Sequence, residues 1–345
     1  MENQPIKRQK SVSVLRVIAT IAVVFSHTYS TLLESVSEDV LSSIQYDFFD
    51  ICSNVLKWHV PIFYMITGAL LLKKDFISPK DCVCKYAKRM FIALLLFGIP
   101  FSLIIQFFEI QTFNVSMLWK SILMTLSNQS FGHLWYLFTI IGVYLMLPAI
   151  KGIVVNCEKN VQKYILVVLY LCCFVIPFVN TVFDISLAFN VPIGGNVLFY
   201  LLLGYYISNL DVEKLKKYRK FAVFCIILCV LVIVLFNYLF DTANVVMSYN
   251  SPVNVIFTLS VYVIVSSAIY GETGKKLWLF DRLCFGVYLI HPVFIQFLYR
   301  FLKITPVSFE QWVIMTIIFS IGFTAIAFTC SWVMSKIKPL KKYIL

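Results

Sequence analysis

Ten long apolar runs divide the sequence, and they constrain its fold more than any other feature. A helix needs about 20 apolar residues to cross a hydrocarbon core of about 30 Å, and each run comes close to that length or exceeds it. Only 13% of the residues are charged, whereas soluble domains hold about 25%. We therefore expect an all-α integral membrane protein, with about ten transmembrane helices in one bundle and a single domain over residues 1–345. The runs cover residues 12–33, 50–72, 87–109, 132–153, 161–181, 192–209, 219–240, 252–270, 283–302 and 311–336.

Basic residues gather in alternate connections between these runs. The remaining connections hold only three of them, Lys120, Arg300 and Lys303. Connections rich in lysine and arginine stay on the cytoplasmic side, so we expect both termini in the cytoplasm. This topology accounts for the net charge of +12, and we expect membrane lipid, and no nucleic acid, as a partner. The basic set comprises the first ten residues and the connections at 73–89, 151–163, 214–220, 275–282 and 336–342.

Several classes of site are disfavoured by what the runs contain. Most of the ten cysteines lie inside apolar runs, where cysteine behaves as a small hydrophobic residue, so we expect neither disulfides nor a metal site. The sequence has no glycine-rich phosphate loop and no HExxH helix. No aspartate or glutamate is expected deep in a span, which disfavours a glycosidase pair of carboxylates and a carboxylate proton relay.

The first run carries an arginine near its start and a histidine near its end. Arg16 and His27 are eleven positions apart, which is about three helical turns and roughly 16 Å of rise. Both side chains therefore lie on nearly the same face of a helix. On the expected topology, Arg16 is near the cytoplasm and His27 is in the outer half of the membrane.

All four histidines lie in a run or at its edge. His59 is expected in the outer half together with Lys57, His133 at the outer start of its run, and His291 in the inner to middle part. Ionisable groups at membrane depth are costly, so they are functional candidates. The alternative for each is a hydrogen bond that only joins two helices. Together they favour a shared polar cavity across the membrane.

The connection at 73–89 holds six basic residues on the expected cytoplasmic side. It can bind a phosphate-bearing ligand of the cytosol. Topology alone is an equally sufficient explanation for these charges.

Four stretches resemble motifs of the acyltransferase-3 family of membrane-bound acyltransferases, and especially its short ten-span glycan O-acetyltransferases. The family spacing of an arginine, ten residues and a histidine is matched by Arg16 and His27. The stretch KYAKR at 85–89 departs from the arginine pair of the family, and Thr67 replaces a serine while keeping the hydroxyl. The four stretches are LRVIATIAVVFSH at 15–27, KWHVPIFYMITGALLL at 57–72, HLWYLFTIIGVYLMLP at 133–148 and FGVYLIHP at 285–292.

The resemblance implies acetyl-CoA, or another acyl-CoA, as a cytosolic donor substrate, with no tightly bound cofactor. It implies a cell-surface or lipid-linked carbohydrate as the acceptor partner and the bacterial cell membrane as the location. It makes His27 the catalytic base or acyl carrier, assisted by His133. The donor-binding residues are then Arg16, Lys85, Lys88, Arg89, Tyr288 and His291, and the acceptor-binding residues are Lys57, His59 and Trp135.

Alternatives stay open for several of these roles. Lys57 either meets an acidic acceptor or pairs with a backbone carbonyl. Tyr288 is equally suited to packing, and Trp135 to the aromatic belt at a membrane surface. The competing class is a transporter or exporter of a glycan or lipid-linked intermediate, which inverted repeats or broken helices would favour.

Overall fold

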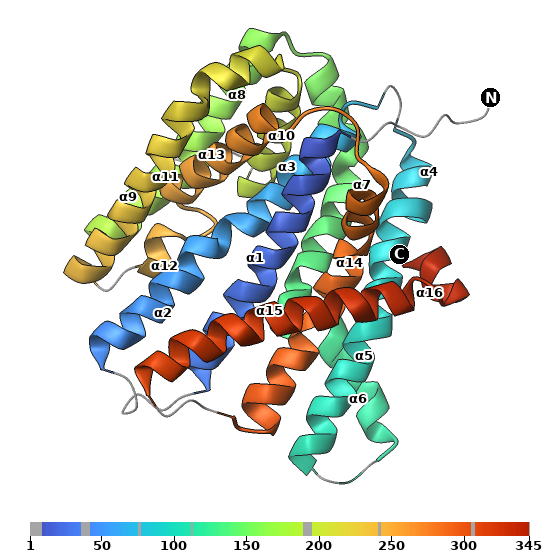
Figure 1. Cartoon of the computed structure of the whole chain (residues 1–345). Helices are drawn as coiled ribbons and strands as arrows, with labels where there is room; N and C mark the ends of the chain where they lie inside the picture. The colour runs from blue at the N-terminus through green and yellow to red at the C-terminus, as the bar shows by residue number, and fades with distance from the viewer. Residues whose placement is uncertain are drawn as a thin grey trace.

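The protein, seen in a computed structural model, is built from helices (Figure 1). The structure describes residues 9–35, 42–74, 77–110, 112, 114–188, 195–240, 243–304 and 308–344. Within these residues, the only β pairing is one isolated bridge between Gln9 and Glu272. Seven of the described helical segments are long and apolar enough to cross a membrane. The all-α membrane fold predicted from the sequence is therefore confirmed.

The order of the elements follows the apolar runs closely. Their bounds are α1 (Lys10–Glu34), α2 (Ser43–Val55), η1 (Leu56–Trp58), α3 (His59–Leu71), α4 (Pro79–Asp81), η2 (Cys82–Ala87), α5 (Lys88–Ile110), α6 (Ser116–Leu126), η3 (Gly132–Leu134), α7 (Trp135–Val155), α8 (Lys159–Tyr170), η4 (Leu171–Val175), α9 (Ile176–Phe183), α10 (Asn196–Ser208), α11 (Val212–Phe240), α12 (Ala243–Val246), α13 (Pro252–Ala268), α14 (Lys275–Gln296), η5 (Phe297–Phe301), α15 (Phe309–Met334) and α16 (Lys338–Tyr343).

Each of the ten expected runs falls on one or more of these helices, but three runs lie outside the seven long segments, and their main helices have 17 residues or fewer. α3 and α10 have 13 residues each, and α13 has 17. The count of ten spans and the cytoplasmic position of both termini therefore stay predictions.

Polar side chains account for several helix starts. Ser251 accepts a hydrogen bond from the backbone N–H of Val253 at the start of α13, directly before Pro252. Ser308 accepts one from Gln311 at the start of α15. Such caps satisfy N–H groups that have no partner inside the helix, and proline at the first position has no N–H to satisfy.

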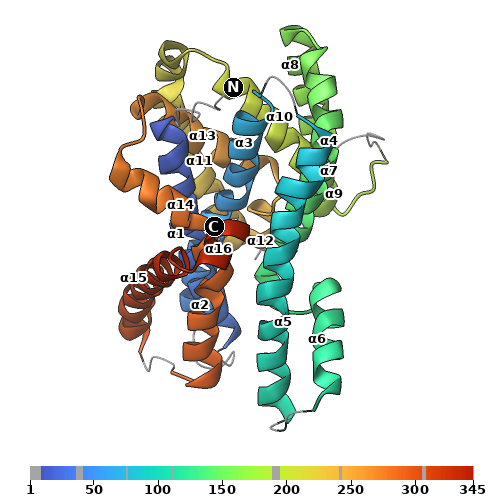
Figure 2. The same cartoon turned by 90° about the vertical axis from the view of Figure 1, so that its right-hand side faces the viewer.

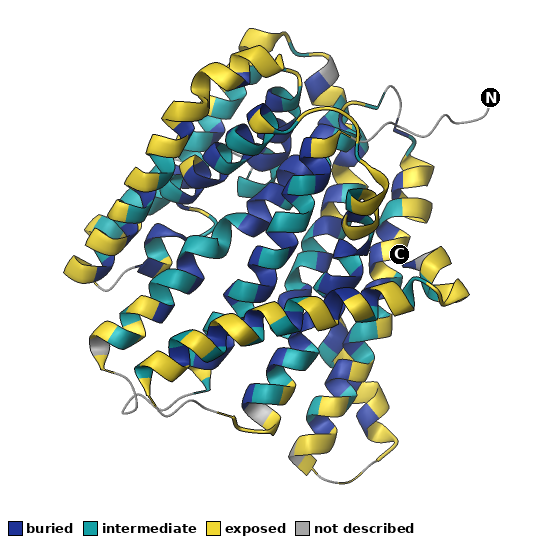
Figure 3. Ribbon diagram, viewed as in Figure 1, coloured by how far each residue is buried: buried dark blue, intermediate teal, exposed yellow. Residues whose placement is uncertain are grey.

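α1 and α14 form the centre of the bundle and run in the same direction. Arg16 of α1 is ion-paired with Asp281 of α14, and further along both helices a ring nitrogen of His27 lies 2.8 Å from one of His291. These two segments are the most buried of the seven long ones. In Figure 3, exposed residues gather instead on the outer helices α8, α11 and α15. A shared direction is what the first and ninth spans of a ten-span topology require, since both are odd-numbered.

α5 and α6 lie side by side at one edge of the bundle (Figure 2). The buried amide of Gln106 on α5 donates hydrogen bonds to the hydroxyl of Ser121, at 2.6 Å, and to the backbone oxygen of Met117. These contacts fix α6 on the last turns of α5. The first turn of α5, at the other end of the helix, lines a cavity in the bundle.

α3 and α10 meet at two glycines that face each other's backbone. A Cβ atom on Gly68 would overlap the backbone of Leu201, and one on Gly204 would overlap the backbone of Met65. Small residues allow this close approach of membrane helices. The glycine that follows Thr67 in the second motif is therefore a packing residue.

We expect Gly68→Ala to destabilise the protein by about 1–3 kcal/mol, because α10 must move away from α3 to make room. The measurement is the thermal unfolding midpoint of the purified protein in detergent. Gly142→Ala on α7 is the matched control, since a Cβ there meets no atom within 4 Å, and its midpoint should stay the same or rise. Equal midpoints for the two variants would contradict the packing role of Gly68.

Candidate active site

One cavity of about 390 Å³ extends along the central helices from Arg16 and Asp281 to His27 and Tyr288. Side chains from α1, α3, α7 and α14 line it, together with residues at the junction of η2 and α5. The cavity brings together seven of the residues singled out from the sequence, and their separate roles stay predictions. The seven are Arg16, His27, His59, Arg89, His133, Trp135 and Tyr288.

Hydrogen bonds at the histidine end define which nitrogens carry protons. Nδ1 of His291 lies 2.9 Å from the backbone oxygen of Tyr288 and 3.1 Å from that of Val287. A carbonyl oxygen only accepts, so Nδ1 of His291 carries the proton and its Nε2 is an acceptor in the neutral ring. That Nε2 lies 2.8 Å from Nδ1 of His27, which therefore donates. The proton of the neutral His27 ring is thus on Nδ1, and its Nε2 has a free lone pair.

His291 lies behind His27 and is not part of the cavity lining. It is fully buried, and its ring stacks on that of His27 with centroids 5.1 Å apart. The expectation that His291 lies lower in the membrane than His27 is wrong. α14 begins at Lys275, eight residues before the start of the apolar run, which brings His291 level with His27.

His133 and His59 complete a cluster of four imidazoles. The ring centroid of His133 is 5.5 Å from that of His291, and the centroid of His59 is 6.5 Å from that of His27. Both are buried, and neither ring nitrogen of His133 has a hydrogen bond of normal geometry among the described residues. The hydroxyl of Tyr288 donates to the backbone oxygen of His133 at 2.7 Å, so Tyr288 holds the start of α7 against α14. Side chains with unused polar atoms beside a cavity are suited to contact a ligand.

The opposite end of the cavity is cationic and contains one buried carboxylate. Asp281 is ion-paired with Arg16, and the hydroxyl of Ser13 donates to its other oxygen at 3.0 Å. The Arg16 side chain is 20% exposed, whereas that of Asp281 is 0% exposed. A guanidinium has five N–H donors, so Asp281 orients Arg16 and leaves it donors for a ligand.

Sequence reasoning missed Asp281, because residues 275–282 looked like a connection rather than helix. The expectation that no carboxylate lies deep in a span does not hold for the side chain, which is buried two turns into α14. A single acidic residue inside a basic stretch was the available signal. Arg282, which also lines the cavity, was counted only for topology.

The basic residues before and at the start of α5 separate into two groups. Arg89 lines the cavity, its Nε donates to the backbone oxygen of Ile344 at 2.6 Å, and its guanidinium lies over the ring of Phe285. Lys85 and Lys88 are exposed and do not line the cavity. Of the three donor-binding candidates in this stretch, the structure brings only Arg89 to the cavity wall.

Of the predicted acceptor-binding residues, some line the cavity and one does not. Trp135 lines the cavity and its ring centroid is 5.7 Å from that of Tyr249. Lys57 lies in the 3₁₀ turn between α2 and α3, where its Nζ donates to the side-chain oxygen of Asn244 at 3.0 Å. Lys57 does not line the cavity, and its hydrogen-bond acceptor among the described residues is a side-chain oxygen rather than a backbone carbonyl.

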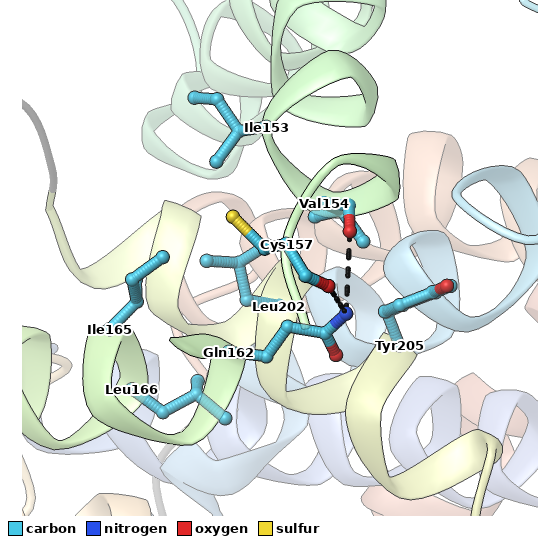
Figure 4. Close-up of a pocket in the computed structure, with 8 residues that line it drawn as sticks. All are labelled: Ile153, Val154, Cys157, Gln162, Ile165, Leu166, Leu202 and Tyr205. Carbon is cyan, nitrogen blue, oxygen red and sulfur yellow. Dashed lines mark hydrogen bonds between the residues drawn. The ribbon is translucent and has the colours of Figure 1, made fainter. Parts of the chain in front are cut away.

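Other concave features are less suited to chemistry. Within the described residues, no three His, Cys, Asp or Glu side chains are arranged to hold a metal ion. A small pocket of about 10 Å³ between α7, α8 and α10 is largely apolar (Figure 4). There the amide nitrogen of Gln162 donates to the backbone oxygens of Val154 and Cys157, so its two N–H donors are already used.

The fold and the cavity define a multi-pass membrane protein with a polar site that joins arginines to histidines. The chain belongs to the acyltransferase-3 family, whose model, described as an acyltransferase domain, matches residues 9–336. The family predicted from the four motifs is therefore confirmed. No curated protein and no solved structure matches the chain.

Proposed function

We propose that this membrane acyltransferase moves an acetyl group from acetyl-CoA to a hydroxyl of a cell-surface or lipid-linked carbohydrate. The observation that carries the proposal is the single cavity with cations at one end and His27 at the other. About 16 Å of helix separates Arg16 from His27, so a long, thin donor with phosphates at one end and a thioester at the other suits it. The membrane acyltransferase class follows from the family, while the donor and acceptor are our proposal.

In this mechanism the phosphates of the donor bind Arg89, Arg282 and the free donors of Arg16. Arg89 is exposed at its end of the cavity, so the donor enters there, on the cytoplasmic side of the expected topology. Guanidinium groups suit phosphate oxygens because they offer several N–H donors in one plane. The thioester then reaches the histidine end.

Nε2 of His27 is the base of the reaction. It removes the proton of the sugar hydroxyl as the oxygen attacks the thioester carbon, and it returns that proton to the sulfur of the departing CoA. The products are an O-acetyl ester and CoA with a free thiol, so atoms and charge balance. His291 accepts from Nδ1 of His27 throughout and stabilises the imidazolium that forms. A neutral N–H of His133 is available to the thioester oxygen as it gains negative charge.

The same nitrogen of His27 serves a two-step path, in which it first takes the acetyl group and then passes it to the sugar. Broken helices would favour the transporter alternative, and the 3₁₀ turn at Leu56–Trp58 between α2 and α3 is an interruption of this kind. That turn preserves helical backbone angles on both sides, and the family favours the enzyme.

The test uses sealed, inverted membrane vesicles that contain the protein, with labelled acetyl-CoA added outside. We expect label in the glycan fraction and release of CoA, and neither in vesicles with His27→Ala. Movement of a glycan across the vesicle membrane without acetyl transfer would support the transporter and overturn the proposal.

His291 is a positioning residue in this mechanism, because it acts through His27. We expect His291→Leu to lower kcat about 10²-fold, since Nδ1 of His27 loses its acceptor, while KM for acetyl-CoA changes little. His291→Gln keeps an acceptor oxygen near Nδ1 of His27 and should recover most of the loss. Equal kcat values for the leucine and glutamine variants, at equal thermal stability, would refute this role.

A further inference from the structure

A second cavity, of about 540 Å³, adjoins the first one and has no role in the mechanism so far. It lies between α3, α7, α10 and the residues just before α13. The two cavities share three lining residues, Val60, Trp135 and Tyr249. Val60 directly follows His59 in α3, and Trp135 is two residues after His133. The shared wall is therefore built from the same short segments that carry two of the histidines.

The lining of this second cavity is polar but uncharged. Its described residues include two amides and five hydroxyl groups, and no Asp, Glu, Lys, Arg or His. The amide of Asn196 donates to the side-chain oxygen of Asn250 at 2.6 Å. An amide has two N–H donors, so this bond leaves donors of both residues for a ligand.

Two of the hydroxyl groups, those of Tyr64 and Tyr200, are buried and have no hydrogen bond among the described residues. Tyr200 is 1% exposed, lines the cavity, and its hydroxyl has no hydrogen bond among the described residues. A buried polar group without a partner lowers stability, and a polar ligand would relieve this cost. The tilted rings of Trp135 and Tyr249 add apolar faces beside these polar atoms. Apolar faces with a few placed polar groups are the usual composition of a small-molecule site.

We propose that the second cavity binds the acceptor and that it selects an uncharged sugar unit. A sugar ring has C–H faces for the aromatic rings and hydroxyls for the amides and for Tyr200. Burial of a carboxylate or phosphate in this cavity is costly because no described lining residue offers a counter-charge. The hydroxyl to be modified extends past the shared wall toward His27. This inference rests on the proposed acyl transfer, and it replaces Lys57 and an acidic acceptor with a neutral one.

The experiment measures sugar binding without catalysis. Ser248 lines the cavity, so a Ser248→Cys variant is labelled with a maleimide in the absence of acetyl-CoA, and the label at position 248 is quantified by mass spectrometry. The probes are a neutral glucose and N-acetylglucosamine oligosaccharide and its counterpart with one glucuronic acid unit. We expect the neutral probe to slow labelling and the acidic one to have little effect.

Two variants in the Ser248→Cys background test the assigned contacts. Asn250→Ala and Tyr200→Phe should each weaken protection by the neutral probe about 5- to 10-fold, the loss of one hydrogen bond. The hydroxyl of Tyr200 has no partner in the structure, so its removal should not lower thermal stability. Asn209→Ala at the other end of α10 is the control for loss of an amide, since Asn209 does not line the cavity.

Each outcome has a separate meaning. Better protection by the acidic probe, or none by either probe, overturns the inference. Acetyl transfer to the neutral probe without protection also overturns it and leaves the enzyme function intact. Protection by the neutral probe that Asn250→Ala and Tyr200→Phe weaken supports the sugar site, even where no acetyl group is transferred and the proposed function fails.

Discussion

Replacement of His27 with alanine should lower acetyl transfer by about 10²- to 10⁴-fold, the usual contribution of a general base. The variant loses Nε2 of His27, whose lone pair the hydrogen bonds leave free to take the proton of the hydroxyl. The cations to which we assign donor binding lie at the other end of the cavity, so the Kd of acetyl-CoA should change less than about threefold. The measurements are CoA release with an acceptor present and acetyl-CoA binding by calorimetry.

His59→Ala is the matched control for this experiment, since it removes another imidazole from the same cavity wall. It should lower the rate far less than His27→Ala, because the mechanism assigns no proton transfer to it. A rapid-quench search for acetylated His27 in the natural protein then distinguishes a covalent path from direct transfer. Normal turnover by folded His27→Ala protein would refute both paths.

Arg16→Ala should lower both the stability of the protein and its affinity for the donor. Removal of the arginine takes one positive charge away from the buried carboxylate of Asp281, and the loss of one member of a buried pair costs about 3–5 kcal/mol. The variant also loses the N–H donors that face the cavity. We expect a lower unfolding midpoint together with at least tenfold weaker binding of acetyl-CoA.

The double variant Arg16→Met and Asp281→Leu separates the two effects. It removes both charges, so the unfolding midpoint should recover, because apolar replacements of a buried ion pair are often neutral or stabilising. Binding of acetyl-CoA should stay weak. Lys216→Ala, which breaks the exposed pair with Glu213, is the control and should change neither property. Recovery of donor binding in the double variant would exclude Arg16 as a donor contact.

The sequence was sufficient for the fold class, for the family and for the meeting of Arg16 with His27 in one cavity. Hydropathy predicts membrane helices because the bilayer leaves few alternatives, and two residues on one helix keep their spacing whatever surrounds them. The position of His291 depended on where α14 begins. Apolar residues alone do not mark that start, because the first two turns of α14 include the buried Asp281, which contacts Arg16 and Ser13.

Contacts between distant segments explain the remaining differences. Lys85, Lys88 and Arg89 look alike as cations, and only the packing of α5 against its neighbours turns Arg89 to the cavity. Asn196 and Asn250 belong to no motif, and they meet because α10 and the segment before α13 converge. Such residues have no signal in a single sequence.

The wall shared by the two cavities has a consequence for the cell. A passage lined by polar groups from one side of a membrane to the other would let protons and ions leak and would dissipate the membrane potential. Val60, Trp135 and Tyr249 stand between a cavity that holds arginines and one that holds amides, and all three are largely apolar. If the acyl group crosses the membrane as we propose, the large rings of Trp135 and Tyr249 would keep the two cavities from forming one continuous path for ions.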